Sequence, residues 1–63
     1  MNETFNVSFL NDTGERNWLL DAEDPDGALH QAMQLSDSAA GVYSVWDLND
    51  LWGTPLVEHE IPG

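Results

Sequence analysis

Carboxylates are the chemically active groups that this sequence supplies in quantity. Twelve Asp and Glu residues stand against a single cation, Arg16, and the formal net charge is -11 at pH 7. Four of the acids fall within residues 21–26, and Glu58 and Glu60 form a closely spaced pair. Carboxylates at such spacings could move protons, hold a divalent cation or bind the guanidinium groups of a partner. Each of these chemistries makes a different demand on the rest of the chain.

Proton chemistry is poorly supported. Asp12-Thr13-Gly14 matches the short signature of aspartic proteases, which need two carboxylates that share a proton in a closed cleft. A chain of 63 residues is too short to build that cleft, and the same tripeptide is common in hairpin turns. Acid–base work by Glu58 and Glu60 would need a concave site that a domain this small hardly offers. We therefore expect no enzymatic activity.

Metal chemistry lacks the required spacing. Residues 24–27, Asp-Pro-Asp-Gly, hint at a calcium loop, but the first and last ligand positions of that loop would fall on Ala22 and Met33. The two histidines, His30 and His59, have no metal-ligand spacing, and the chain has no cysteine. We expect residues 24–27 to cap a helix, and we expect no metal or other cofactor.

Hydrophobic periodicity predicts the elements that must position the acids. A helix should begin at Asp24 and Pro25, which suit the N-cap and first helical position, and end near Leu35 or Ser36. Alternation of polar and apolar residues predicts strands over residues 4–10, 16–22, 42–48 and 56–61. The β-β-α-β-β order predicts an α+β fold, a single domain over residues 1–63. One α-helix would pack on a mainly antiparallel three- to four-stranded sheet.

One helix covers only one face of a sheet, so the other face should be open to solvent. The alternation assigns to the covered face Phe5, Val7, Phe9, Trp18, Leu20, Trp46 and Leu48, with Val57 and Ile61. It assigns to the open face Asp21, Tyr43, Asp47, Glu58 and Glu60. Carboxylates from three strands would then share one surface, with residues 21–26 at its edge.

This pattern predicts an acidic surface that binds a partner. Its predicted residues are Asp12, Glu15, Asp21, Glu23, Asp24, Asp26, Asp47, Asp50, Glu58 and Glu60. Trp52, in the loop before the last strand, either folds back onto the core or serves as an exposed aromatic anchor.

The charge also excludes partners. Direct binding to nucleic acid or to an anionic membrane needs Lys and Arg, which are almost absent. No apolar run approaches the ~20 residues of a spanning helix, and we expect no signal peptide from the first residues, which lack a basic and an apolar region. We expect a cytoplasmic monomer whose partner is a basic protein surface.

As a whole chain, the sequence resembles small phage-encoded anti-CRISPR proteins, particularly those that imitate DNA, and it is similar to the type I-C inhibitors among them. The resemblance lies in the short length, the acidic residues 21–26, the pairs Asp47/Asp50 and Glu58/Glu60, and the lack of Lys and Cys. It implies a non-catalytic inhibitor in the bacterial host cytoplasm. Such a protein would occupy the basic DNA- and PAM-binding surface of a type I interference complex, with the large subunit of Cascade as the partner.

Two alternatives explain the same composition. A halophilic domain would carry carboxylates on all faces and fold only in concentrated salt. An acidic inhibitor of another DNA-binding host protein would share the chemistry and differ only in its partner.

Overall fold

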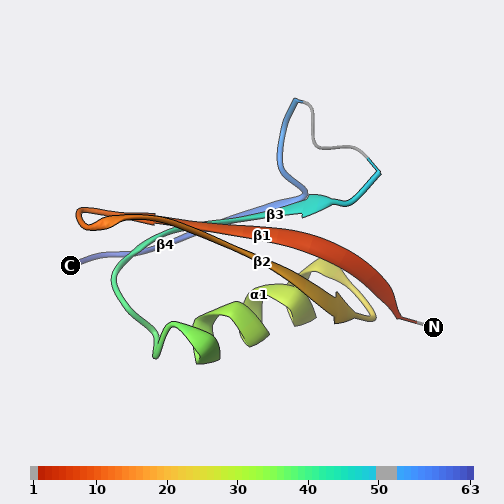
Figure 1. The fold of residues 1–63 in the computed structure, drawn as a ribbon, viewed down its shortest axis with the longest axis horizontal. Helices are drawn as coiled ribbons and strands as arrows, with labels where there is room; N and C mark the ends of the chain where they lie inside the picture. Colours follow the sequence, from red (N-terminus) through yellow and green to blue (C-terminus); the bar gives the residue numbers. More distant parts are fainter. Residues whose placement is uncertain (1, 50–52) are drawn as a thin grey trace.

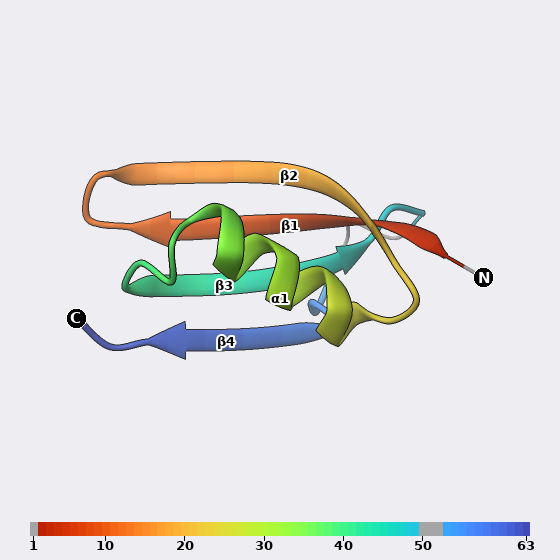
Figure 2. The same ribbon diagram turned by 90° about the horizontal axis from the view of Figure 1, so that it is seen from below.

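The predicted order of elements is present in the computed structural model, which describes residues 2–49 and 53–63 (Figure 1). The strands form one antiparallel sheet in the order β2-β1-β3-β4, and the single helix crosses one face of it (Figure 2). The fold class predicted from the sequence is therefore confirmed. The elements are β1 (Glu3–Asn11), β2 (Gly14–Ala22), α1 (Pro25–Leu35), β3 (Gly41–Asp47) and β4 (Val57–Ile61).

The β1–β2 hairpin forms where the turn residues predict it. Asn11 pairs with Gly14 across a two-residue turn, and the Oδ1 atom of Asn11 accepts hydrogen bonds from the backbone and side chain of Thr13, at 2.9 and 2.7 Å. The register then runs without a break to Glu3 opposite Ala22.

The helix begins and ends as its sequence predicts. Asp24 is the N-cap, and its Oδ1 accepts a hydrogen bond from the Gly27 amide at 2.7 Å. Pro25 occupies the first turn, where its missing N–H is not needed. A helix this short depends on packing, and its apolar stripe of Ala28, Leu29 and Ala32 is buried against the sheet.

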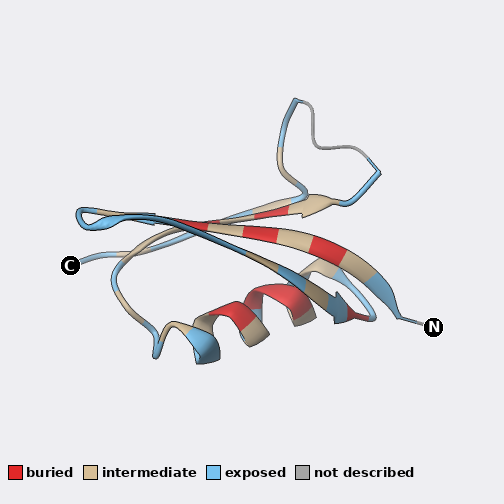
Figure 3. Cartoon of the chain, viewed as in Figure 1, coloured by how far each residue is buried: buried red, intermediate tan, exposed pale blue. Residues whose placement is uncertain are grey.

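The core lies between α1 and the inner face of the sheet (Figure 3). Trp18, Leu20, Val57 and Ile61 pack at its margin, on the predicted side. Among the described residues, the buried side chains are Phe5, Val7, Phe9, Ala22, Ala28, Leu29, Ala32, Tyr43 and Val45.

One strand faces the opposite way from its prediction. Tyr43 and Val45 of β3 are buried beneath the helix, so Trp46 projects from the open face and Asp47 lies on the covered side, beside its cross-strand partner Phe5. Leu48, predicted to be covered, follows the end of the strand and is exposed. The predictions for Tyr43, Trp46, Asp47 and Leu48 were therefore wrong.

A specific set of contacts fixes this orientation of β3. The Tyr43 ring stacks on Phe9 with ring centroids 4.5 Å apart. Its hydroxyl donates to the Ala39 carbonyl at 2.9 Å and is hydrogen-bonded to the Ser36 hydroxyl. These partners satisfy the polar end of a buried tyrosine, which allows Tyr43 rather than Trp46 to occupy the core.

Candidate partner-binding surface

The open face of the sheet is defined by the strand residues that alternate with the buried ones. Each outward residue has its neighbours fixed by the strand register. The open face consists of Thr4, Asn6, Ser8 and Leu10 of β1, Glu15, Asn17, Leu19 and Asp21 of β2, Val42, Ser44 and Trp46 of β3, and Glu58 and Glu60 of β4.

The carboxylates of the open face lie on its two edge strands. In one row across the sheet, Glu15 stands beside Leu10, Leu10 beside Val42, and Val42 beside Glu60. The next row holds Glu58 on β4 and uncharged side chains on the other three strands. The open face therefore has acidic edges and an uncharged centre, rather than acids from three strands spread across it.

The four acids of residues 21–26 lie at one end of the sheet. Asp21 is the next-to-last residue of β2, while Glu23, Asp24 and Asp26 occupy the connection to α1 and its first turn. All four side chains are exposed. Asp47, at the end of β3, lies at this end although it faces the covered side.

Sequence reasoning missed Glu3, which belongs to the same end. Glu3 is exposed and pairs with Ala22, between Asp21 and Glu23. The sequence could have predicted this position, because the turn at residues 11–14 fixes the hairpin register and hence places Glu3 opposite Ala22. We call the following group the acidic end: Glu3, Asp21, Glu23, Asp24, Asp26 and Asp47.

Two carboxylates of the acidic end also have structural roles. Asp24 caps α1 through its bond to the Gly27 amide. The Oδ1 atom of Asp21 accepts a hydrogen bond from the Thr4 hydroxyl at 2.6 Å. Removing these two charges without losing the hydrogen bonds requires Asn rather than Ala, because an amide oxygen accepts in the same place.

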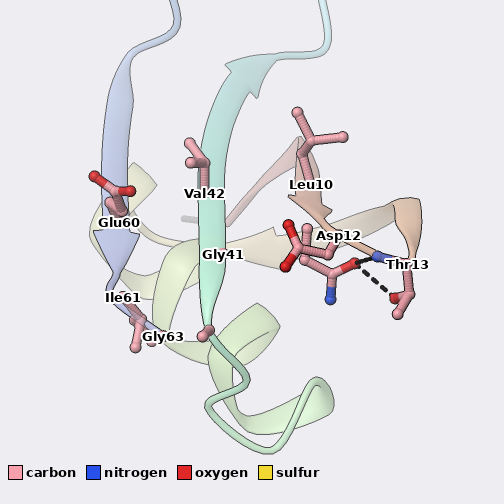
Figure 4. Close-up of a pocket in the computed structure, with 10 residues that line it drawn as sticks. Leu10, Asp12, Thr13, Gly41, Val42, Glu60, Ile61 and Gly63 are labelled. Carbon is pink, nitrogen blue, oxygen red and sulfur yellow. Dashed lines mark hydrogen bonds between the residues drawn. The ribbon is translucent and has the colours of Figure 1, made fainter.

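The opposite end of the sheet holds a shallow hollow of about 620 Å³ (Figure 4). Asp12 of the hairpin turn and Glu60 of β4 stand on its two sides with Leu10 and Val42 between them, and Ile61 lines it beside Gly63. Asp12, Glu15 and Glu60 thus gather at this second end. The nine predicted residues that lie in the described ranges therefore do not form one continuous cluster.

Two predictions fall on residues outside the described ranges. Asp50 was placed in the acidic surface and Trp52 was proposed as an aromatic anchor, and both lie in residues 50–52.

Neither histidine has a metal-binding environment in the part of the chain that the structure describes. His30 on α1 and His59 on β4 are exposed, and no group of three or more His, Cys, Asp or Glu side chains among residues 2–49 and 53–63 could hold a metal ion. Within the same ranges, α1 is too short to cross a membrane, and no other helix is long and apolar enough to do so.

Most of the solvent-facing side of α1 lacks carboxylates. From Gly27 to Ser36 the sequence contains no Asp or Glu, and residues such as His30, Gln34 and Leu35 are exposed there. After Asp26 in its first turn, α1 therefore carries no further carboxylate, and Asp37 follows just beyond its C-terminal end.

Comparison with protein-family models, curated proteins and solved structures found no match for this chain.

Proposed function

We propose that this chain is a non-catalytic inhibitor that occupies a basic nucleic-acid-binding surface of a partner protein and excludes the nucleic acid. The observation that carries the proposal is the acidic end, where six carboxylates come from three strands and the start of α1. Side chains of Lys and Arg that bind phosphates would bind these carboxylates instead, with Arg able to form bidentate pairs.

The shape of the molecule supports this proposal. Its longest dimension is 33 Å, a length over which duplex DNA carries about 19 charges at one per about 1.7 Å. The twelve carboxylates of this chain approach the charge density of DNA only if they are concentrated on part of the surface rather than spread evenly over it. The absence of carboxylates from α1 after Asp26 favours an uneven distribution of the acids, and it disfavours the halophilic alternative, which expects acids on every face.

The partner that we propose is a type I CRISPR interference complex, through the PAM- and DNA-binding surface of its large subunit. This step depends on the resemblance to small anti-CRISPR proteins. Arg and Lys side chains that reach PAM bases or phosphates are the groups that an acidic competitor would engage. Another DNA-binding host protein would present the same chemistry.

Competition for DNA tests the proposal. The chain is used to capture partners from a bacterial lysate, and the purified partner is then titrated with labelled target DNA in the presence of the chain. We expect DNA binding to fall as the chain is added, with an inhibition constant that weakens as salt rises. A captured partner that binds DNA equally well with the chain in excess would overturn the proposal.

A charge-removing variant locates the contact. The substitutions Glu3→Gln, Asp21→Asn, Glu23→Gln, Asp24→Asn and Asp26→Asn keep the hydrogen-bond acceptors of the acidic end while removing five charges. We expect this variant to fold and to lose inhibition. The matched control is Asp37→Asn, which changes an exposed carboxylate just beyond the C-terminal end of α1 and should leave inhibition intact. Full inhibition by the folded five-site variant would exclude the acidic end as the contact.

A further inference from the structure

The open face carries exposed apolar side chains, which imitation of DNA does not require. Leu10 and Leu19 leave 56% and 66% of their surface exposed on this face. Val42 lies directly beside Leu10, and Trp46 is separated from Leu19 only by Asn6. The polar row of Asn17, Ser8 and Ser44 separates these two groups of apolar side chains. Exposed apolar side chains with polar groups around them are typical of a protein-binding surface.

Carboxylates lie on both edge strands of this face. Glu15 lies on β2, while Glu58 and Glu60 lie on β4, the other edge strand. Neighbouring strands are about 4.8 Å apart, so the two edge strands are separated by about 14 Å. An α-helix with its side chains is about 10–12 Å across, which fits between them.

We propose that the open face receives an amphipathic basic α-helix of the partner protein, lying along β1 and β3. Its apolar stripe would pack on Leu10, Val42 and Trp46. Lys and Arg on its flanks would meet Glu15 on one side and Glu58 and Glu60 on the other. The inference rests on the proposed function, which supplies a basic protein as partner, and it adds that binding is anchored by apolar contact as well as by charge.

The inner face shows that this sheet accepts a helix. On that side, α1 packs through the small and apolar residues Ala28, Leu29 and Ala32 onto the same four strands. A helix on the open face would complete a second layer of the same kind, from the other side.

Charge complementarity selects a basic partner over a second copy of this chain. The only helix in the described residues, α1, contains no Lys or Arg, and Arg16 is the single such residue in the sequence. Two copies meeting through their open faces would oppose Glu15, Glu58 and Glu60 with further carboxylates. A like-charged contact of this kind is unfavourable.

The probe for this inference is a pair of labelled synthetic peptides. One is a helical peptide with a leucine stripe flanked by Lys and Arg, and the other has the same composition in a shuffled order that destroys the stripe. Both carry the same charge, so affinity that depends on charge alone would be equal. We expect the amphipathic peptide to bind the full chain at least about tenfold more tightly, as burial of a few apolar anchors requires.

Paired variants assign the difference to the open face. The triple variant Leu10→Thr, Val42→Thr and Trp46→Thr keeps residues that suit strands and removes the three apolar side chains on which the stripe would pack. The control, Leu35→Gln, changes a leucine on α1 that is 57% exposed, close to the exposure of Leu10. We expect the triple variant to lose the preference for the amphipathic peptide and the control to keep it, with circular dichroism confirming that both are folded.

The possible results separate this inference from the proposed function. Equal binding of the two peptides, or a preference that survives in the folded triple variant, would overturn the apolar anchor while leaving competition with DNA untouched. Self-association that is lost in the triple variant would show that a second copy occupies the face, and would also overturn it. Failure of the chain to displace DNA from its captured partner would instead refute the proposed function.

Discussion

The ring of Tyr43 lies on the ring of Phe9 at a centroid distance of 4.5 Å, and this stack joins β3 to β1 beneath the helix. The Tyr43 hydroxyl reaches past the sheet to Ala39 and Ser36, in the segment that leads from α1 to β3. One side chain thus connects the hairpin, the end of the helix and the third strand. Because Tyr43 is fully buried, its contacts decide which side of β3 faces the solvent.

The first prediction concerns the Tyr43 hydroxyl. Tyr43→Phe keeps the stack on Phe9 and removes both hydrogen bonds, leaving the Ala39 carbonyl without this donor. We expect the free energy of unfolding, measured with urea, to fall by about 1–2 kcal/mol. Ser36→Ala is the partner for a double-mutant cycle, and a coupling between the two sites is expected because they share a hydrogen bond. Strictly additive effects would show that this bond contributes nothing.

The second prediction concerns the close approach of β1 to β3 at Gly41. A Cβ atom at this position would lie 2.5 Å from Cε1 of Phe9 and 2.6 Å from the carbonyl oxygen of Leu10. The backbone of Leu10 cannot yield cheaply, so Gly41→Ala should force the strands apart. We expect a loss of roughly 1–3 kcal/mol in thermal or urea unfolding, typical of overpacking.

The control for Gly41 is Gly63→Ala, whose added Cβ would meet only Ala40, at an ordinary distance of 3.5 Å. This control should unfold like the parent chain. Equal stability of the two variants would contradict the tight approach at Gly41.

The sequence predicted the elements well because their signals are local. The turn at residues 11–14 and the Asp24-Pro25 cap act within a few residues of the chain, and each element formed within one or two residues of its predicted bounds. The alternation of β1, β2 and β4 was equally clear, since each has one plainly apolar side.

The orientation of β3 could not be predicted in the same way. Residues 42–48 have apolar side chains on both alternating sets, and the set with Val42, Trp46 and Leu48 is the more apolar by count. Burial of the set with Tyr43 is decided by contacts outside the strand, namely the Phe9 ring and the hydrogen-bond partners of the Tyr43 hydroxyl. This inversion moved Asp47 off the open face and put Trp46 there, so that the face has acidic edges and an uncharged centre of polar and apolar side chains.

The third prediction separates the charge of Asp24 from its capping role. Asp24→Ala removes the acceptor for the Gly27 amide and should destabilise the chain by about 1 kcal/mol. Asp24→Asn keeps an acceptor at the cap and should cost less. The measurement is the urea midpoint of both variants, with Glu23→Gln as an exposed neighbour that should change it little.

The relative stabilities of Asp24→Ala and Asp24→Asn separate the two roles of Asp24. If Asp24→Asn is as unstable as Asp24→Ala, the charge of Asp24 rather than its hydrogen bond supports the helix. The five-site variant used to test inhibition would then need Asp24 left in place.

The fourth prediction concerns salt, which distinguishes an inhibitor from a halophilic domain. Glu58 and Glu60 are two residues apart on one strand, about 7 Å by strand geometry, and twelve carboxylates share one small molecule. Their repulsion acts against folding at low ionic strength and is screened as the Debye length falls from about 30 Å at 0.01 M to about 10 Å at 0.1 M. We expect circular dichroism to show a folded chain at both salt concentrations, with a Tm higher by several degrees in the more concentrated one.

A variant with fewer carboxylates is the control for the thermal unfolding experiment. Glu58→Gln with Glu60→Gln removes two exposed charges from β4, so its Tm should rise less with salt than that of the parent chain. A parent chain that stays unfolded until molar salt is added would favour the halophilic alternative. An acidic competitor for a basic surface must be folded before its partner neutralises its carboxylates. The proposed function therefore requires a chain that folds at low salt, with a Tm that depends less on salt as carboxylates are removed.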